Sequence, residues 1–256
     1  MATSSPVINF ACYYGSGRLD DLAAFDLTIL QPLHYTQQDN ERLRLAGCAC
    51  LAYLSLGELA EEDAAAQWRL LDRQTGQALR NQRWGTVYVD CRLGAWQDEV
   101  VNRRVPAITE RGFAGLFLDT IDVQEIFPET RAGVVELVQR LRAGYPELLL
   151  AANRGFSILP HIMPAIDAIV FEAFTTHCQD GSYAAWRGPD LLWTEHRATE
   201  LRAICGDRPI LALDYAAPED DTLRRLAERR AAGHSFLSFV TTCYADWLPA
   251  RTVSGQ

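Results

Sequence analysis

Lysine is missing from this sequence, so all 24 basic side chains other than histidine are arginine. Schiff-base enzymes and pyridoxal-phosphate enzymes need a lysine amine for their chemistry, and the usual P-loop needs a lysine to hold phosphate. The absence of lysine therefore excludes these classes, including the aldolases that act through a Schiff base.

Long apolar runs are missing as well. No stretch approaches the roughly 20 apolar residues that a membrane-spanning helix needs, so we expect no membrane span. The first six residues, MATSSP, contain neither the charged region nor the apolar region of a signal peptide. We therefore expect no signal peptide in this sequence.

Metal-binding and nucleotide-binding motifs are also absent. The five histidines are dispersed, with neither H-x-x-x-H nor H-E-x-x-H spacing, and there is no C-x-x-C pair. No G-x-G-x-x-G opens a helix after the first predicted strand. Ser55 lies in LSLG, which is not the G-x-S-x-G of a nucleophile elbow. We expect neither a metal nor a cofactor.

Positive charge is in the minority. There are 33 acidic side chains against 24 basic ones, which gives a formal net charge of -9. A nucleic-acid partner is not expected, because phosphate contacts need a basic face. The negative balance is compatible with a neutral or cationic substrate.

We also expect the protein to be a monomer.

The seven cysteines are odd in number and scattered along the chain. We expect them to be buried thiols that pack as small hydrophobic side chains. Thiols without partners favour a reducing compartment. The cysteines stand at positions 12, 48, 50, 91, 178, 205 and 243.

Eight short apolar runs alternate with longer amphipathic segments, of which Ala95–Glu110 and Ala132–Ala143 have helical spacing. Continuous apolar runs indicate strands buried on both faces, as in a parallel sheet, and their alternation with helices indicates βαβ units. We predict an α/β protein in which residues 1–256 form one (β/α)8 barrel, with an open doubly wound sheet as the alternative. The runs are Val7–Tyr14, Leu27–Leu30, Cys48–Leu56, Leu116–Asp119, Leu148–Ala152, Ala168–Phe171, Pro209–Leu213 and Ser235–Val240.

Polar residues follow every one of these runs. In a (β/α)8 barrel the carboxyl ends of the strands meet at one rim, which is where active sites lie. We therefore expect the following residues at one rim: Tyr13, Tyr14, Gln31, Tyr53, Ser55, Glu58, Asp119, Asp122, Asn153, Arg154, Glu172, Asp214, Tyr215, Thr241 and Thr242.

Asp119 ends the most apolar strand, Glu172 ends a strand flanked by aromatic and aliphatic residues, and Asp214 also directly follows an apolar run. Glycoside hydrolysis uses two carboxyl groups, and an apolar environment of the kind expected around Glu172 suits a general acid. We interpret Asp119 and Glu172 as a catalytic pair. The alternatives are that Asp119 caps the next helix and that Glu172 pairs with an arginine at the barrel mouth.

Other acids at the rim have both functional and structural interpretations. Gly57 would allow a sharp turn that aims Glu58 across the mouth, in a substrate-binding or a structural role. Asp122 is a candidate helix cap as well as a substrate contact. Asp214 could bind a sugar hydroxyl or amine, or cap the helix expected near Pro218.

Aromatic residues at the rim could form stacking platforms for sugar rings, although aromatic side chains more often pack in a core. These are Tyr13, Tyr14, Trp186 and Trp193.

Three motifs stand in order along the predicted strand ends: AYLSLGE at 52–58, GFAGLFLDTID at 112–122 and NRGF at 153–156. FACYYG at 10–15 and FDLTIL at 25–30 belong to the same ordered set. From about Ile8 to about Tyr215 the chain resembles the endo-α-1,4-polygalactosaminidase group. This group comprises glycoside hydrolase family 114 and the related family 166 hydrolase domain of the Pel exopolysaccharide protein.

The resemblance implies a (β/α)8 barrel that hydrolyses galactosamine-containing polysaccharide outside the cytoplasm. It implies Asp119 as nucleophile or stabilising carboxylate and Glu172 as general acid/base. A partly deacetylated galactosamine chain is cationic, which suits a cleft with Glu58, Asp122 and Asp214. Gln31 stands near the place where these families usually carry an acid.

Two other functions remain open at this point. One is a carbohydrate-binding barrel without hydrolysis, acting as a partner module in exopolysaccharide handling. The other is a barrel enzyme of different chemistry, such as a phosphosugar isomerase. No glycine-rich phosphate loop follows the seventh or eighth strand, which disfavours the latter.

Overall fold

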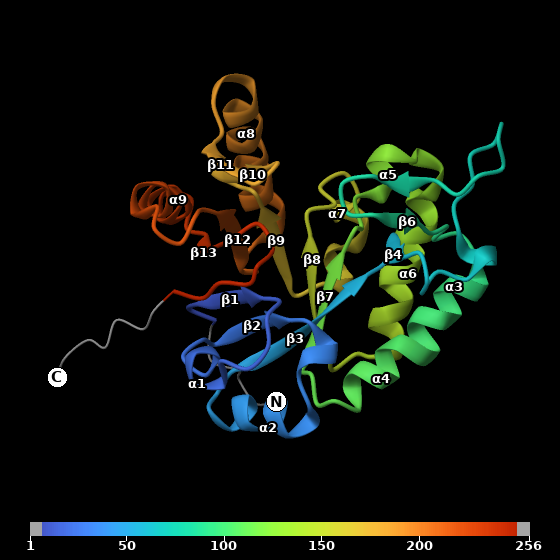
Figure 1. Cartoon of the computed structure of the whole chain (residues 1–256), viewed down its shortest axis with the longest axis horizontal. Coiled ribbons are helices and arrows are strands. Elements are labelled where there is room, and N and C mark those ends of the chain that lie inside the picture. Colours follow the sequence, from blue (N-terminus) through green and yellow to red (C-terminus); the bar gives the residue numbers. More distant parts are fainter. Residues whose placement is uncertain (1–6, 250–256) are drawn as a thin grey trace.

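Eight parallel strands follow one another around a barrel in chain order (Figure 1). The structure is a computed structural model and describes residues 7–249, so MATSSP, on which the signal-peptide expectation rests, lies outside the described residues. The predicted (β/α)8 fold is confirmed. The strands are β1 (Phe10–Tyr13), β2 (Leu27–Leu30), β3 (Ala49–Ser55), β7 (Gly115–Asp119), β8 (Leu149–Asn153), β9 (Ala168–Glu172), β12 (Ile210–Tyr215) and β13 (Leu237–Thr241).

The barrel closes between its first and last strands through side chains and one backbone hydrogen bond. The rings of Phe10 on β1 and Phe239 on β13 lie 5.8 Å apart between centroids. Just beyond these strands, the backbone N–H of Tyr14 donates to the carbonyl of Ala245 at 2.6 Å. The apolar runs seen in the sequence form the core on both faces of this curved sheet.

Helices connect the strands on the outer surface of the barrel (Figure 1). The predicted helix over Ala132–Ala143 is α6 and is one residue longer at each end. The described helices are α1 (Leu19–Leu22), α2 (Gln37–Leu45), α3 (Gly94–Glu99), α4 (Val105–Thr109), α5 (Val123–Ile126), α6 (Arg131–Gly144), α7 (Leu159–Ile162), α8 (Gly188–Cys205) and α9 (Asp221–Gly233).

The segment predicted as one helix over Ala95–Glu110 is interrupted. A π-helical turn, Val100–Arg104, joins α3 to α4. Pro106 stands in the first turn of α4, where it has no N–H to donate and its ring would crowd the carbonyl four residues earlier. The wider π turn ahead of it accommodates both effects.

Two small antiparallel sheets rise from the rim where the barrel strands end. Between β3 and β7, a three-stranded sheet has the order β4-β6-β5. Between β9 and α8, β10 pairs with β11 as a hairpin. Figure 1 shows this hairpin and α8 on one side of the barrel and β6 with α5 on the other. The strands are β4 (Glu58–Ala60), β5 (Arg80–Asn81), β6 (Thr86–Tyr88), β10 (Thr176–Gln179) and β11 (Ser182–Ala185).

Two glycines of the recognised motifs are required by close packing. A Cβ on Gly115 would lie 2.1 Å from the carbonyl oxygen of Leu149 on the neighbouring strand. A Cβ on Gly57 would lie 2.6 Å from the carbonyl oxygen of Thr120. Gly57 is not among the residues with positive φ, so it is needed for this approach and not for the sharp turn expected from the sequence.

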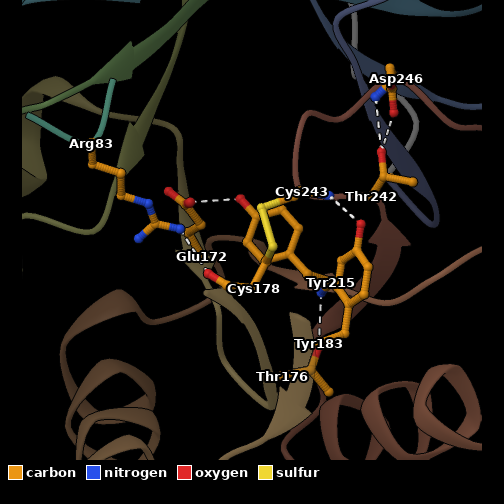
Figure 2. Close-up of a disulfide and its surroundings, with 9 residues drawn as sticks. All are labelled: Arg83, Glu172, Thr176, Cys178, Tyr183, Tyr215, Thr242, Cys243 and Asp246. Atoms are coloured by element: carbon orange, nitrogen blue, oxygen red, sulfur yellow. Dashed lines mark hydrogen bonds between the residues drawn. A yellow bond between two sulfur atoms is a disulfide. The ribbon is translucent and has the colours of Figure 1, made fainter. Parts of the chain in front are cut away.

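The cysteines correct one expectation. Cys178 on β10 and Cys243, just after β13, form a disulfide across 65 residues (Figure 2). The other five cysteines are buried thiols, as predicted. The expectation that all seven are unpaired is wrong, and the argument for a reducing compartment that rested on it fails with it.

The disulfide should contribute measurably to stability, because it closes a long loop in the unfolded chain. Replacing both residues, Cys178→Ser with Cys243→Ser, should lower the free energy of unfolding by about 2–5 kcal/mol. Urea denaturation of the oxidised protein, the reduced protein and the double variant measures this. Reduction should have no effect on the double variant, and equal midpoints for oxidised and reduced wild-type protein would contradict the expectation.

Candidate active site

Four neighbouring barrel strands each end in a side chain that points toward one site. Asp119 ends β7, Asn153 ends β8, Glu172 ends β9 and Tyr215 ends β12. These strands are adjacent in the sheet in this order. Because side chains alternate between the two faces of a strand, one residue from each strand end can face the barrel interior.

The amide of Asn153 connects the two acids. Its Nδ2 donates to Oδ1 of Asp119 at 2.7 Å and to Oε2 of Glu172 at 2.7 Å. The other carboxylate oxygen of Glu172, Oε1, accepts from the hydroxyl of Tyr215 at 2.6 Å. Figure 2 shows this last contact beside the disulfide. Both oxygens of Glu172 are therefore held by donors.

The shared donor limits the separation of the two carboxylates. Oδ1 of Asp119 and Oε2 of Glu172 can be no farther apart than twice 2.7 Å, since each accepts from the same nitrogen. Retaining glycosidases hold their two carboxyl groups about 5–5.5 Å apart, whereas inverting enzymes separate them by about 6.5–9.5 Å. This upper bound on the oxygen–oxygen distance is compatible with the shorter separation.

Burial, followed by the charge of Glu172, raises the pKa of Asp119 above its usual value. The hydrogen bonds from Asn153 and from Tyr53 act in the opposite direction and lower the pKa of Asp119. Like charges at this distance disfavour double ionisation, and donors to the charged form relieve that cost. Asn153 therefore constrains the spacing of the pair and limits the rise in the pKa of Asp119.

Tyrosines form much of the surrounding wall. The rings of Tyr14 and Tyr53 meet edge to face with centroids 5.4 Å apart. Burial raises the pKa of Tyr14, Tyr53 and Tyr215 well above the usual tyrosine value, and the nearby Asp119 raises it further in all three. These hydroxyls consequently stay protonated and can donate hydrogen bonds to a carboxylate or a sugar.

The backbone turns in the same unusual way after three of the site residues. Thr120, Arg154 and Ala173 directly follow Asp119, Asn153 and Glu172, and they have φ values of 55°, 55° and 52°. A residue other than glycine in this left-handed region costs roughly 1–2 kcal/mol. At each of these three positions a barrel strand ends and a loop at the rim begins.

Comparison with known proteins identifies the family. A model of glycoside-hydrolase family GH114 matches residues 3–246. The chain belongs to glycoside-hydrolase family GH114. It is therefore a glycoside hydrolase, and the resemblance inferred from the rim motifs is confirmed. A comparison with curated protein sequences finds no match.

Solved structures support the same assignment. The glycoside hydrolase domain of PelA from Pseudomonas aeruginosa is 27% identical with a TM-score of 0.84, over 96% of this chain and 98% of that domain. Ega3 from Aspergillus fumigatus, solved in complex with galactosamine, is 12% identical with a TM-score of 0.68, over 96% of each chain. The second similarity is evidence for the fold alone.

Two residues expected at the substrate surface lie elsewhere. Asp214 has no exposed surface, and its Oδ1 accepts from the backbone N–H groups of Thr175 and Thr176 at 2.6 and 2.7 Å. Tyr13 is 6% exposed, and its hydroxyl donates to the carbonyl of Ser16 at 3.4 Å. Neither side chain can contact a sugar in this position, so neither is part of the substrate site proposed below. Burial raises the pKa of Asp214 to about 6.

Asp122 and Arg154 face each other across 3.8 Å. Asp122 stands at the cap position of α5 but makes no side-chain cap hydrogen bond. The alternative interpretation of Asp122 as a helix cap is therefore not observed. Burial raises its pKa to about 6, and the charge of Arg154 limits the rise. Both residues remain predicted substrate contacts.

Three further predicted residues lie near the rim without a tested role. The hydroxyl of Ser55 donates to the carbonyl of Glu58 at 2.6 Å. The carboxylate of Glu58 accepts from Thr86 at 2.6 Å, which ties it to the β4-β6-β5 sheet. Gln31 precedes a short 3-10 turn and its side chain is partly exposed. Substrate binding by these three residues stays a prediction.

Within residues 7–249 no group of three or more histidine, cysteine, aspartate and glutamate side chains could hold a metal ion. No helix in this range is long and apolar enough to cross a membrane.

Asn153→Ala should lower kcat by about 10²-fold, since a misplaced catalytic carboxyl costs this order of magnitude. Losing the hydrogen bond raises the pKa of Asp119 further, and a group that acts ionised loses activity as pH falls through its pKa. The acidic limb of the pH–rate profile should thus move to higher pH. Hydrolysis rates across the pH range measure the shift.

The matched control is Asn40→Ala. Asn40 is 1% exposed on α2, and its Nδ2 donates to the carbonyl of Arg111 at 2.8 Å, away from the site. This variant should lose stability while the shape of its pH profile is unchanged. A pH profile of Asn153→Ala identical to that of the wild type would contradict the positioning role.

Proposed function

We propose that this protein hydrolyses a galactosamine-containing polysaccharide, partly deacetylated and cationic, by a retaining two-carboxylate mechanism. The observation that carries the proposal is the amide of Asn153, which donates to an oxygen of Asp119 and to an oxygen of Glu172 at 2.7 Å each. This shared donor supports the short separation that a retaining pair needs. In this proposal Asp119 is the nucleophile and Glu172 is the general acid/base.

The reaction takes two steps. In the first, a carboxylate oxygen of Asp119 bonds to the anomeric carbon, the glycosidic C–O bond breaks, and Glu172 gives its proton to the leaving oxygen. In the second, Glu172 takes a proton from water, the water oxygen bonds to the anomeric carbon, and the bond to Asp119 breaks. The sugar leaves with its original configuration after two inversions.

The surroundings favour this division of roles. Glu172 lines an open cavity, where it can exchange a proton with a leaving group and with water. Asp119 does not line this cavity, and Asn153 donates to its Oδ1. The nucleophile must stay ionised beside a second carboxyl, and this donor favours the ionised form.

The substrate class follows from charge and from the related proteins. Asp122 lies beside the catalytic pair, and the whole chain has a net charge of -9, which favours a cationic sugar. Ega3, which shares the fold, is described in complex with galactosamine. The family resemblance implies endo action, which the length of the products tests.

Wild-type protein should cleave partly deacetylated polygalactosamine into oligosaccharides and leave an equivalent glucosamine polymer largely intact. Asp119→Asn and Glu172→Gln should each lower kcat by about 10²–10⁴-fold, because each removes one half of the carboxyl pair. Mass analysis gives product lengths, and NMR of the first product gives the anomeric configuration.

Asp207→Asn is the control, because Asp207 is exposed and precedes β12 at the opposite end of the barrel. Its activity should match that of the wild type, and all variants should show the wild-type unfolding midpoint within a few degrees. Full activity in both catalytic variants would refute the assignment of the pair. An inverted first product would refute the retaining mechanism alone.

A further inference from the structure

A cavity of about 320 Å³ opens beside Glu172. Its volume is at the lower end of the range for sites that bind small molecules. Glu172 contributes to its wall, and Asp119 does not. The remaining lining residues are Arg154, Ala173, Trp186, Asp190, Trp193 and Thr194.

Two indole rings in the cavity wall are held by the protein itself. Trp186 stacks on His177 with centroids 4.0 Å apart, and its Nε1 donates to the carbonyl of Ala173 at 2.7 Å. Trp193 on α8 packs against Phe156 at 5.7 Å between centroids and is still 40% exposed. A rigid, partly exposed indole costs little conformational entropy when it binds a ligand.

Charge is distributed unevenly around this cavity. Arg154 is engaged by Asp122 across 3.8 Å, so its positive charge is partly offset. Asp190 is exposed in the first turn of α8, and its carboxylate has no ion-pair partner among residues 7–249.

An ammonium group entering the cavity would meet the carboxylate of Asp190 and the indole rings of Trp186 and Trp193. One face of Trp193 is approached by the guanidinium of Arg197 at 5.6 Å, which leaves the other face for a ligand. Indole is the aromatic ring that attracts cations best.

The position of the cavity relative to the catalytic pair sets the direction of the substrate. The general acid protonates the oxygen of the leaving sugar, so that sugar must lie on the side of Glu172. The sugar that becomes attached to the nucleophile lies on the side of Asp119. A cavity lined by Glu172 and not by Asp119 therefore receives the leaving part of the chain.

We propose that this cavity is the leaving-group subsite, and that Trp186, Trp193 and Asp190 bind a protonated hexosamine there. The proposal rests on the proposed function for the roles of Asp119 and Glu172. The apolar C–H face of the sugar stacks on indole, and the carboxylate of Asp190 pairs with the ammonium group. The enzyme would thus select deacetylated residues on the side of the cut that is released first.

The test compares substrates whose leaving groups differ. On partly deacetylated polygalactosamine a hexosamine leaves, and on α-galactosaminyl fluoride a fluoride ion leaves, which does not fill the cavity. Trp193→Ala and Asp190→Asn should lower kcat/KM on the polymer by roughly 2- to 30-fold, the range of one cation–π or ionic contact. The loss on the fluoride should be several-fold smaller in both variants.

Acetylation separates the two contributions. On a fully N-acetylated polymer there is no ammonium group, so Asp190→Asn should lose its effect while Trp193→Ala keeps most of its own. Trp193→Phe should restore part of the loss, because phenylalanine retains an aromatic face. Leu192→Ala, the adjacent and 70% exposed residue of α8 that does not line the cavity, and Asp207→Asn are the matched controls.

Each outcome decides the proposal. Equal losses on polymer and fluoride, or no loss on the polymer, would overturn the subsite. If Trp193→Ala fails to fold, the exposed Asp190 still gives the charge test. If wild-type protein hydrolyses neither substrate, the proposed function fails instead. Calorimetric titration with galactosamine oligosaccharides then tests the subsite by itself, and equal affinity of wild type, Trp193→Ala and Asp190→Asn would overturn it.

Discussion

The two hydrogen bonds from the amide of Asn153 are the interaction on which the rest of the site depends. Two carboxylates this close repel each other when both are ionised, and without a shared donor they would turn apart or share a proton. One amide group has two N–H bonds in a fixed plane, so it can satisfy both acids and hold their spacing at the same time. Asn153 can do this because β8 lies between β7 and β9 in the barrel.

The rim around Glu172 is secured by contacts from distant parts of the chain. Tyr215 donates to Glu172 through its hydroxyl, and its backbone N–H donates to Thr176, two residues before Cys178 of the disulfide (Figure 2). The guanidinium of Arg83, from the turn between β5 and β6, donates to the carbonyl of Cys178 at 2.7 Å. The two small sheets above the barrel are therefore joined to each other and to the end of β13. These contacts from outside the barrel strands restrict the surroundings of Glu172.

Buried Asp214 extends this network beneath the hairpin. Its carboxylate accepts from the backbone of Thr175 and Thr176, and the hydroxyl of Thr176 accepts from the backbone N–H of Tyr215 at 2.8 Å. Asp214 thus positions the backbone at the start of β10 and, through Thr176, the residue that holds Glu172. A group interpreted from the sequence as a substrate contact acts on the site indirectly.

The fold could be predicted because barrel strands are continuous apolar runs, and each of the eight runs became one strand. Asp119 and Glu172 were identifiable as candidates because each directly follows an apolar run, although the same pattern also marked Asp214, which is buried. The side to which a rim residue points was harder. Strand β12 continues to Tyr215, two residues beyond the apolar run, so alternation turns Tyr215 inward and Asp214 outward. Nothing local in the sequence marks where a strand stops pairing.

Contacts across the rim left no sequence signal at all. The disulfide joins residues 65 positions apart, with no spacing motif to reveal it. The two-way donation by Asn153 depends on which strands are neighbours in three dimensions. The cavity beside Glu172 is formed by residues of a loop and a helix whose relative placement the sequence pattern does not contain.

The three left-handed residues after Asp119, Asn153 and Glu172 have a consequence for how such an enzyme can change. At each of these positions the backbone turns away from the strand direction within one residue. The conformation of the following loop therefore does not determine where the side chain of the preceding Asp119, Asn153 or Glu172 points. The two carboxylates proposed as catalytic belong to the barrel strands, and the loops proposed to contact the polymer do not carry them. Changes in these loops could therefore alter glycan specificity while Asp119 and Glu172 keep their places.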